Sequence, residues 1–120
     1  MATPSLHQEL ILQHYRKSKR RGRMDAPDVE RALTNPVCGD EVTVQLRLDG
    51  DRIAEVRFHG HGCTISQAAA SMMAQQIEGL TLDEASTRLA RFREMLQGDD
   101  AAAADPSLGD LRALAGVSRL

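Results

Sequence analysis

Two glycine-containing segments hold both cysteines of the chain, together with side chains that can share a ligand with them. Cys38 is followed two residues later by Asp40, and Cys63 is preceded by His59 and His61. Thiolate, carboxylate and imidazole groups are the ligands that a borderline-soft divalent metal selects. A site that binds a metal or carries sulfur is therefore the first hypothesis, and the rest of the chain is expected to hold the two segments together.

Cys63 lies where a helix is expected to begin. The apolar pattern becomes helical from Ile65 onward, so the thiol lies at or just before a helix N-terminus, where free N–H groups and the helix dipole stabilise a thiolate. Gly60 and Gly62 let the backbone bend around Cys63 and leave space for a ligand. These features favour a reactive or metal-binding thiol.

Cys38 and Asp40 flank Gly39 in the other segment. In an extended or tightly turned segment, residues i and i+2 point the same way, so this thiol and carboxylate can bind one ion. Ordinary alternatives stay open. A free cysteine is often a small buried apolar residue, Asp40 can be a turn or cap residue, and His59 and His61 can be surface or supporting groups rather than ligands.

A β-hairpin is predicted in the middle of the chain. Apolar and polar residues alternate over 42–48 and again over 54–58, where Ala54 begins the apolar face. The dipeptide Asp49-Gly50 between these strands is a strong hairpin signal. Because the two outer ends of a hairpin lie side by side, the two cysteine-containing segments are predicted to be neighbours in space, although they are far apart in the sequence.

The other elements are one more strand and several helices. Residues 29–35 are ambiguous between a helical turn and a strand, and Pro36 favours the strand because it disfavours helical backbone at the preceding residue. Helices are predicted from a cap at Ser5 to about Ser18, from Ile65 to Gly79, from the capping box at Thr81 to Gly98, and from a cap at Ser107 to Gly116, with a mobile connection over 99–106.

The composition fits one domain over residues 1–120. Aromatic residues make up only 2% of the chain, so the core must be thin and a bound metal could add to its stability. The net charge of −2 indicates neither a nucleic acid nor a membrane partner. Without a long apolar run or a signal-peptide pattern, a cytoplasmic protein is expected, and its two cysteines are not expected to form a structural disulfide.

One local feature departs from this balanced charge. Six cations follow one another closely near the end of the first predicted helix: Arg16, Lys17, Lys19, Arg20, Arg21 and Arg23. Cations at a helix C-terminus are favoured by the macrodipole, so the run can be a solvated helix end. A docking surface for an acidic partner is the other interpretation.

At these residues the chain resembles the U-type iron–sulfur assembly family, which comprises the SufU, IscU and NifU N-terminal domains. The resemblance covers nearly the whole chain, and the segment around 98–107 is closer to the SufU branch than to the IscU branch. The matching motifs are Asn35-Pro36-x-Cys38-Gly39-Asp40, Gly60-x-Gly62-Cys63-x-Ile65-Ser66, Leu10-Ile11-x-x-His14-Tyr15-Arg16-Lys17 and Leu108-Gly109-Asp110-Leu111.

This resemblance implies an α+β fold with a small antiparallel sheet of about three strands and helices packed on one side. It implies a site of three cysteines and an aspartate, which in the SufU branch holds zinc and accepts persulfide sulfur from a cysteine desulfurase (SufS-like). In the IscU branch the same site assembles a [2Fe–2S] cluster. Carried over, Cys38, Asp40 and Cys63 are the ligands, and Cys38 is the first choice for the sulfur acceptor.

The chain departs from the family pattern at one ligand. The family's third cysteine lies a short way beyond the Gly-Val that matches Gly116-Val117, whereas this sequence ends at Leu120. Either the sequence is truncated, or the site has two thiolates, with His61, water or a partner residue completing it. Three functions follow as expectations: a zinc-dependent sulfur carrier, sulfurtransferase-like rather than a stand-alone enzyme; a [2Fe–2S] scaffold; or a truncated, metal-free protein that binds the desulfurase.

Overall fold

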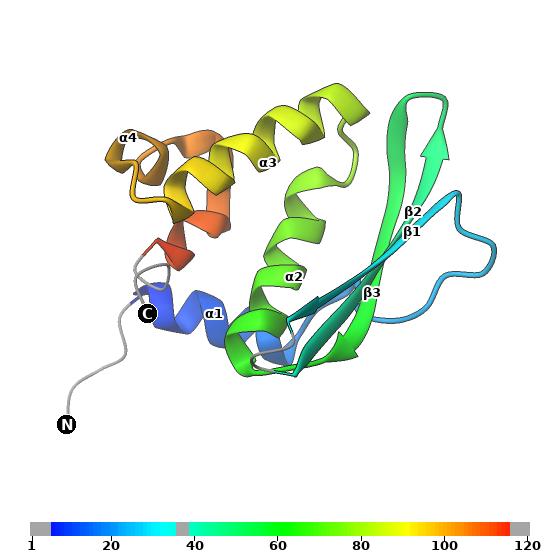
Figure 1. Cartoon of the computed structure of the whole chain (residues 1–120), viewed down its shortest axis with the longest axis horizontal. Coiled ribbons are helices and arrows are strands. Elements are labelled where there is room, and N and C mark those ends of the chain that lie inside the picture. Colours follow the sequence, from blue (N-terminus) through cyan, green and yellow to red (C-terminus); the bar gives the residue numbers. More distant parts are fainter. Residues whose placement is uncertain (1–5, 36–38, 116–120) are drawn as a thin grey trace.

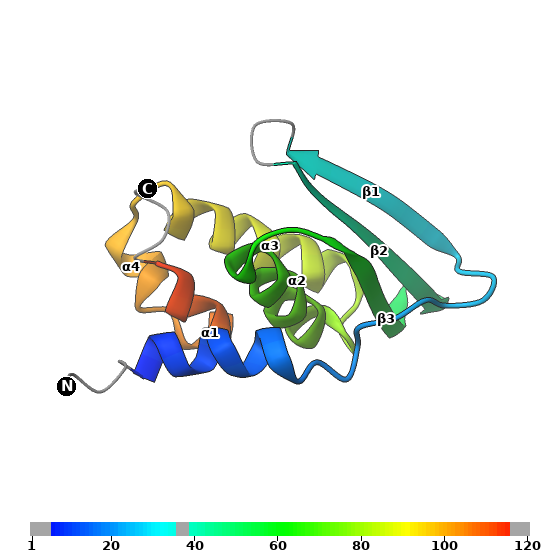
Figure 2. The same ribbon diagram turned by 90° about the horizontal axis from the view of Figure 1, so that it is seen from below.

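Three antiparallel strands form the sheet of this protein in a computed structural model, which describes residues 6–35 and 39–115. They lie in the order β1-β2-β3, where β1 is Val29–Asn35, β2 is Asp40–Asp49 and β3 is Arg52–His61. The strand expected over 29–35 and the central hairpin are therefore confirmed. β1 is an edge strand, and Figure 2 shows it extending away from the helices.

The β2–β3 hairpin contains a bulge that changes which residues of β3 are buried. The pairing shifts between Arg47 and Leu48, so that Leu48 lies opposite Ile53 and Ala54 has no partner of its own. Ile53 is consequently buried, whereas Ala54, which was expected on the apolar face, is exposed. One extra residue in a strand reverses the alternation beyond it, and the alternation of residues 54–58 alone could not reveal this.

Helices lie on one side of the sheet (Figure 1). α2 packs against β3 and β2 with one side and against α1 and a 3₁₀ helix, η1, with the other. The predicted α+β fold, with a three-stranded antiparallel sheet and helices on one side, is confirmed. The helices are α1 (Leu6–Arg16), α2 (Thr64–Ile77), α3 (Leu82–Leu96), α4 (Asp100–Ala103) and η1 (Pro106–Leu114).

α2 contributes to two separate apolar clusters. Ala68 and Met72 pack with residues of α1, α3, α4 and η1 in a helical cluster. Ala70, Ala74 and Ile77 pack with residues of β3 and α3 in a sheet cluster. α2 is therefore the element that joins the sheet to the rest of the helices.

The segment after α3 is more ordered than the sequence suggested. α4 lies within residues 99–106, which were expected to be a mobile connection, and the Asp99 side chain caps it by accepting from the Ala102 N–H at 3.1 Å. The last helix is a 3₁₀ helix capped by Asp105 rather than by Ser107. Both caps are aspartates, which commonly accept from the first N–H groups of a helix. Because the segment around them has a composition typical of a loop, the sequence did not indicate these helices.

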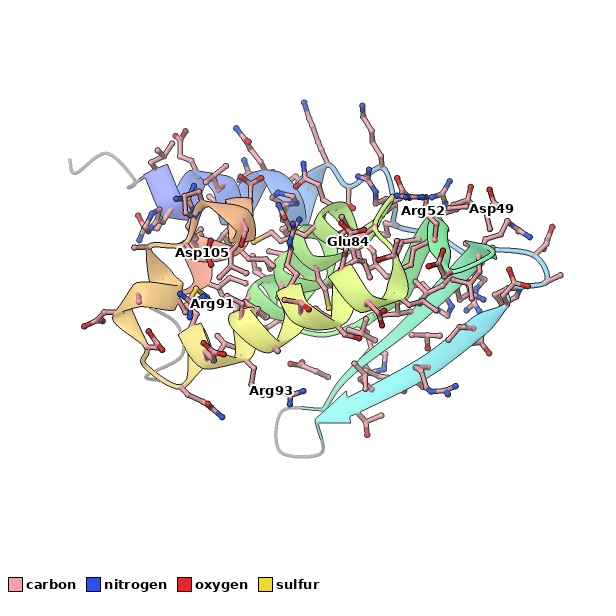
Figure 3. The ribbon with its side chains drawn as sticks, turned by 90° about the horizontal axis from the view of Figure 1, so that it is seen from above. Asp49, Arg52, Glu84, Arg91, Arg93 and Asp105 are labelled. Carbon is pink, nitrogen blue, oxygen red and sulfur yellow. The ribbon has the colours of Figure 1, made fainter. Side chains whose placement is uncertain are left out.

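An ion pair fastens this segment to α3. The Arg91 guanidinium lies 2.9 Å from the Asp105 carboxylate, and Figure 3 shows the two side chains facing each other. Hydrogen bonds from Ser107, together with Arg91, lower the pKa of Asp105 to about 2. The carboxylate thus stays ionised as a cap and ion-pair partner well below neutral pH.

The first helix is shorter than expected. α1 ends at Arg16 rather than near Ser18, and its expected cap at Ser5 lies outside the described residues. No helix in the described part of the chain has the length and apolar character of a membrane span.

Two neighbouring residues of α3 test the helical cluster. Met95 is 2% exposed and Leu96 is 38% exposed. We expect Met95→Ala to lower the free energy of unfolding by about 2–5 kcal/mol, because it leaves a cavity, and Leu96→Ala to lower it by less than about 1 kcal/mol. Urea denaturation followed by circular dichroism measures both, and equal losses would contradict this account of the core.

Candidate sulfur and metal site

The candidate site lies where the open end of the hairpin meets the start of α2. β2 begins at Asp40, and the end of β3 pairs with β2 through His61 opposite Glu41. Two residues after β3, Cys63 is the N-cap of α2. The predictions that Cys63 begins a helix and that the hairpin brings it beside Asp40 are confirmed, whereas Cys38 lies outside the described residues.

Ser66 links the carboxylate of Asp40 to the thiol of Cys63. The Ser66 hydroxyl donates to Asp40 Oδ2 at 2.5 Å, and its oxygen lies 3.3 Å from Cys63 Sγ. The Cys63 backbone N–H donates to Asp40 Oδ1 at 3.3 Å, and the Ser66 N–H donates to Cys63 Sγ at 3.4 Å. These contacts hold one carboxylate and one thiol together at the N-terminal end of α2.

The same contacts influence the proton affinity of Cys63. Hydrogen bonds from the Ser66 hydroxyl and then from its backbone N–H lower the pKa of the thiol below its ordinary value, while desolvation and the charge of Asp40 oppose this. The hydroxyl has a single proton to share between Asp40 and Cys63. The Ser66 N–H is therefore the donor that serves the sulfur without competition, as expected at a helix N-terminus.

Two glycines allow this close approach. Gly60 has φ +144°, and a Cβ there would collide with the carbonyl oxygen of Glu41. A Cβ at Gly62 would lie 2.8 Å from Asp40 Oδ1. The backbone before Cys63 can therefore pass against β2 only because these positions have no side chain.

The two histidines near Cys63 line a separate hollow with Glu41, and neither Asp40 nor Cys63 borders it. His61 is opposite Glu41 in the sheet, its Nε2 lies 3.8 Å from the Glu41 carboxylate, and its side chain is 73% exposed. Because Glu41 follows Asp40 in the strand, the two carboxylates point to opposite faces of the sheet. Among the described residues, no three His, Cys, Asp or Glu side chains are grouped to hold a metal. The structure thus does not bring His61 to the pair as a further ligand.

An apolar groove of about 290 Å³ opens beside Asp40 and Ser66. Leu33 of β1 borders it and is 61% exposed, which is unusual for so large an apolar side chain. The other apolar residues that line it are Val42, Val44, Ala69, Ala70, Met73 and Phe92.

Comparison with known proteins agrees with this architecture. Residues 6–119 match the model of the NifU-like N terminal domain. The zinc-dependent sulfurtransferase SufU of Bacillus subtilis (strain 168) is 36% identical over 96% of this chain and 77% of its own length. The chain belongs to the NifU-like N-terminal domain family. Its expected resemblance to this family is therefore confirmed.

Two further relatives of this NifU-like domain carry IscU and SufU names. The iron–sulfur cluster assembly scaffold protein IscU of Streptococcus pyogenes serotype M1 is 34% identical over 95% of this chain and 70% of its own. FiSufU of Fervidobacterium islandicum AW-1, described as a candidate scaffold for cluster assembly in the SUF system, has a solved structure. It matches with a TM-score of 0.82 and 33% identity, covering 92% of this chain and 80% of that one.

Sequence reasoning about this NifU-like domain missed the role of Ser66. The spacing Cys63-x-x-Ser66 was the available signal, because an N-cap side chain commonly meets the residue three positions later. The contact of Ser66 with Asp40, 26 positions away, required the folded hairpin. The bridge between carboxylate and thiol therefore emerged only from the structure.

A second polar cluster combines serine, histidine and aspartate but is not a catalytic triad. His14 Nδ1 lies 2.8 Å from Ser71 Oγ, and His14 Nε2 lies 2.9 Å from Asp110 Oδ2. Ser71 is only 3% exposed, and its hydroxyl donates to Ser18 Oγ at 2.9 Å. Because no substrate can reach this hydroxyl, the cluster acts as a polar bridge between α1, α2 and η1.

The donors at the N-terminus of α2 fit the metal that the SufU branch implies. A thiol with a lowered pKa and a carboxylate oxygen are both zinc ligands. The two side chains already approach each other through Ser66, and the thiol is exposed. Asp40 and Cys63 can therefore contribute two ligands, and Cys38 remains the predicted third.

Removal of the Ser66 hydroxyl tests the account of the thiol. In metal-free protein with the background substitution Cys38→Ser, we expect Ser66→Ala to raise the pKa of Cys63 and to slow its alkylation severalfold at pH 7. The sign follows because a higher pKa leaves less thiolate, the reactive form. The pH dependence of the iodoacetamide reaction measures this, with the exposed Ser86→Ala as control. An unchanged pH profile would refute the role of the Ser66 hydroxyl.

Proposed function

We propose that this NifU-like domain is a sulfur acceptor and carrier in iron–sulfur cluster assembly, which receives persulfide sulfur from a cysteine desulfurase. The observation that carries the proposal is the exposed Cys63 thiol, which caps α2 with a lowered pKa and is tied through Ser66 to Asp40. An accessible, activated thiol beside a metal-binding carboxylate is what acceptance of sulfur requires. The similarity to a zinc-dependent sulfurtransferase supports the same function.

The transfer of sulfur from the desulfurase to the carrier needs no added oxidant. A carrier thiolate attacks the outer sulfur of the desulfurase persulfide, a new S–S bond forms on the carrier, and the S–S bond of the enzyme breaks. The cysteine of the desulfurase leaves as a thiolate and takes up a proton. The resemblance to the SufU branch makes Cys38 the proposed acceptor, and the activated Cys63 is the second thiol of the site.

Cys38, Asp40 and Cys63 are the proposed zinc ligands. When bound there, zinc would keep the thiolates deprotonated at neutral pH. The chain's own contribution is to position the ligands: the start of β2 presents Asp40, and the cap of α2 presents Cys63. Ser66 orients the carboxylate toward the sulfur.

A scaffold role is the second candidate, with a [2Fe–2S] cluster as its cargo. It is favoured by relatives named iron–sulfur cluster assembly scaffold protein IscU, from Streptococcus pyogenes and Thermotoga maritima, which are 34% and 32% identical to this chain. Cysteine thiolates are the usual ligands of such clusters. Anaerobic reconstitution with iron and sulfide distinguishes the two, because only the scaffold role produces the visible absorption of a cluster.

Metal content tests the ligand set. We expect purified wild-type protein to contain about one zinc per chain, the number that one site holds. Cys63→Ser and Asp40→Ala should each lose most of it, because each removes a ligand. Elemental analysis measures this, with Ser86→Ala as a control that leaves the site intact. Full zinc occupancy in Cys63→Ser would show that the metal lies elsewhere.

Sulfur acceptance tests the function itself. After incubation with a cysteine desulfurase and cysteine, we expect intact-mass analysis to show one added sulfur atom on wild-type protein. Peptide mapping should place that sulfur on Cys38. The variant Cys38→Ser should lose this product while it still binds the desulfurase. A Cys38→Ser variant that accepts sulfur as well as wild type would rule out Cys38 as the acceptor.

A further inference from the structure

The proposed sulfur transfer does not account for the cations that follow α1. Six of the fifteen Lys and Arg residues lie within residues 16–23, and no Asp or Glu occurs between Glu9 and Asp25. In a chain with a net charge of −2, this is a concentrated positive region in an otherwise balanced surface. Such a region raises the local concentration of anionic partners.

The structure holds this segment in a fixed place. The Phe58 N–H donates to the Arg20 carbonyl oxygen at 3.0 Å, and the Gly22 N–H donates to the Phe58 carbonyl oxygen at 2.8 Å, so the segment pairs along the outer edge of β3. Arg20 turns inward and lies 2.9 Å from the Glu78 carboxylate. The segment is therefore part of the fold, and its charges lie at defined positions.

The other five cations of the segment face solvent. They are exposed, and none of them forms an ion pair with a carboxylate in the part of the chain that the structure describes. Arg21 lies over the ring of Phe58, 5.5 Å from its centre, which fixes its guanidinium near β3. These charges remain available to a partner.

Part of this positive surface reaches the candidate site. A hollow of about 430 Å³ is lined by Tyr15, Arg16, Arg21, His61, Gly62 and Gln67. Gly62 directly precedes Cys63, so the hollow lies one residue from the exposed thiol. It is a different depression from the apolar groove, which is bordered by Asp40 and Ser66.

We propose that this basic hollow docks an acidic surface of the cysteine desulfurase and thereby orients the enzyme toward the thiol site. The inference rests on the proposed function, because it names how that partner is recognised. Complementary charges accelerate association and fix the orientation of two proteins. Arg16 and Arg21 are the recognition residues, since both are exposed and line the hollow.

The position of the hollow favours a protein over a nucleic acid. A polyanion lying in it would cover the surface next to Cys63, which must stay open to receive sulfur. Single-stranded nucleic acids also need aromatic platforms for stacking. Tyr15 is the aromatic residue among those that line the hollow, so the base-stacking component of such a site is small.

The test compares variants that remove the same number of charges at two places. Arg16→Gln/Arg21→Gln removes two charges from the hollow. Arg47→Gln/Arg52→Gln removes two from the turn half of the hairpin, where Figure 3 shows Arg52 near Asp49 and where neither side chain lines the hollow. Each of these control arginines donates to a backbone carbonyl, and Arg21 lies over the Phe58 ring, so both double glutamine variants also lose local contacts. Arg16→Lys/Arg21→Lys keeps the charges and tests for a merely structural role.

The readout is the association rate constant with the desulfurase, measured by stopped-flow fluorescence at several salt concentrations. We expect the glutamine double variant in the hollow to associate about tenfold more slowly at low salt, with a weaker salt dependence. The lysine double variant and the Arg47→Gln/Arg52→Gln control should stay near wild type, because neither removes charge from the hollow. Sulfur acceptance at saturating desulfurase should be retained in all of them, because the thiols are unchanged.

The outcomes separate this proposal from the proposed function. Wild-type sulfur acceptance with equal association rates for both glutamine double variants would overturn the docking surface and leave the sulfur carrier intact. No binding and no sulfur acceptance by wild type would overturn both. The wild-type protein can also be tested with a labelled single-stranded RNA. If it binds this RNA more tightly than the desulfurase, and Arg16→Gln/Arg21→Gln abolishes that binding, the hollow is a nucleic-acid site and the docking proposal is overturned.

Discussion

Helix α2 has to bury two faces at once, and most of the structure follows from that constraint. One face packs on β3 through Ala70, Ala74 and Ile77, and the other packs on α1 and η1 through Ala68 and Met72. Small side chains allow both layers to approach closely, in a chain with very few aromatic residues. Because α2 is held on both faces, its N-terminus is held too, and that end carries Cys63.

The N-terminal end of α2 also supplies hydrogen-bond donors to the site. The N–H groups of the first turn have no partners within the helix, and the N–H of Ser66 reaches the sulfur of Cys63. The Ser66 hydroxyl, with its single proton, faces both the carboxylate of Asp40 and the thiol. A carboxylate from a strand and a thiol from a helix cap thus share one hydroxyl.

The surroundings of the thiol are strongly asymmetric. The groove bordered by Asp40 and Ser66 is largely apolar and is lined by residues of two strands and two helices. The hollow bordered by Gly62 is basic, and the segment that supplies its charge is hydrogen-bonded to the edge of β3. A protein that delivers sulfur would meet both surfaces, and the difference between them restricts the orientation in which it can approach.

The sequence alone determined the family, the main strands and helices, and the meeting of Asp40 with Cys63, since alternation, a strong turn signal and a helix start are local patterns. It placed Val56 and Phe58 correctly on the buried face of β3 but Ala54 wrongly, because the bulge at Ala54 depends on pairing with β2. It also treated α4 as a loop and missed the bridge through Ser66. Only the tertiary structure decided that Ser66 joins the site and that His61 faces away. These outcomes depend on which sides of two distant elements come into contact, and no local pattern encodes that.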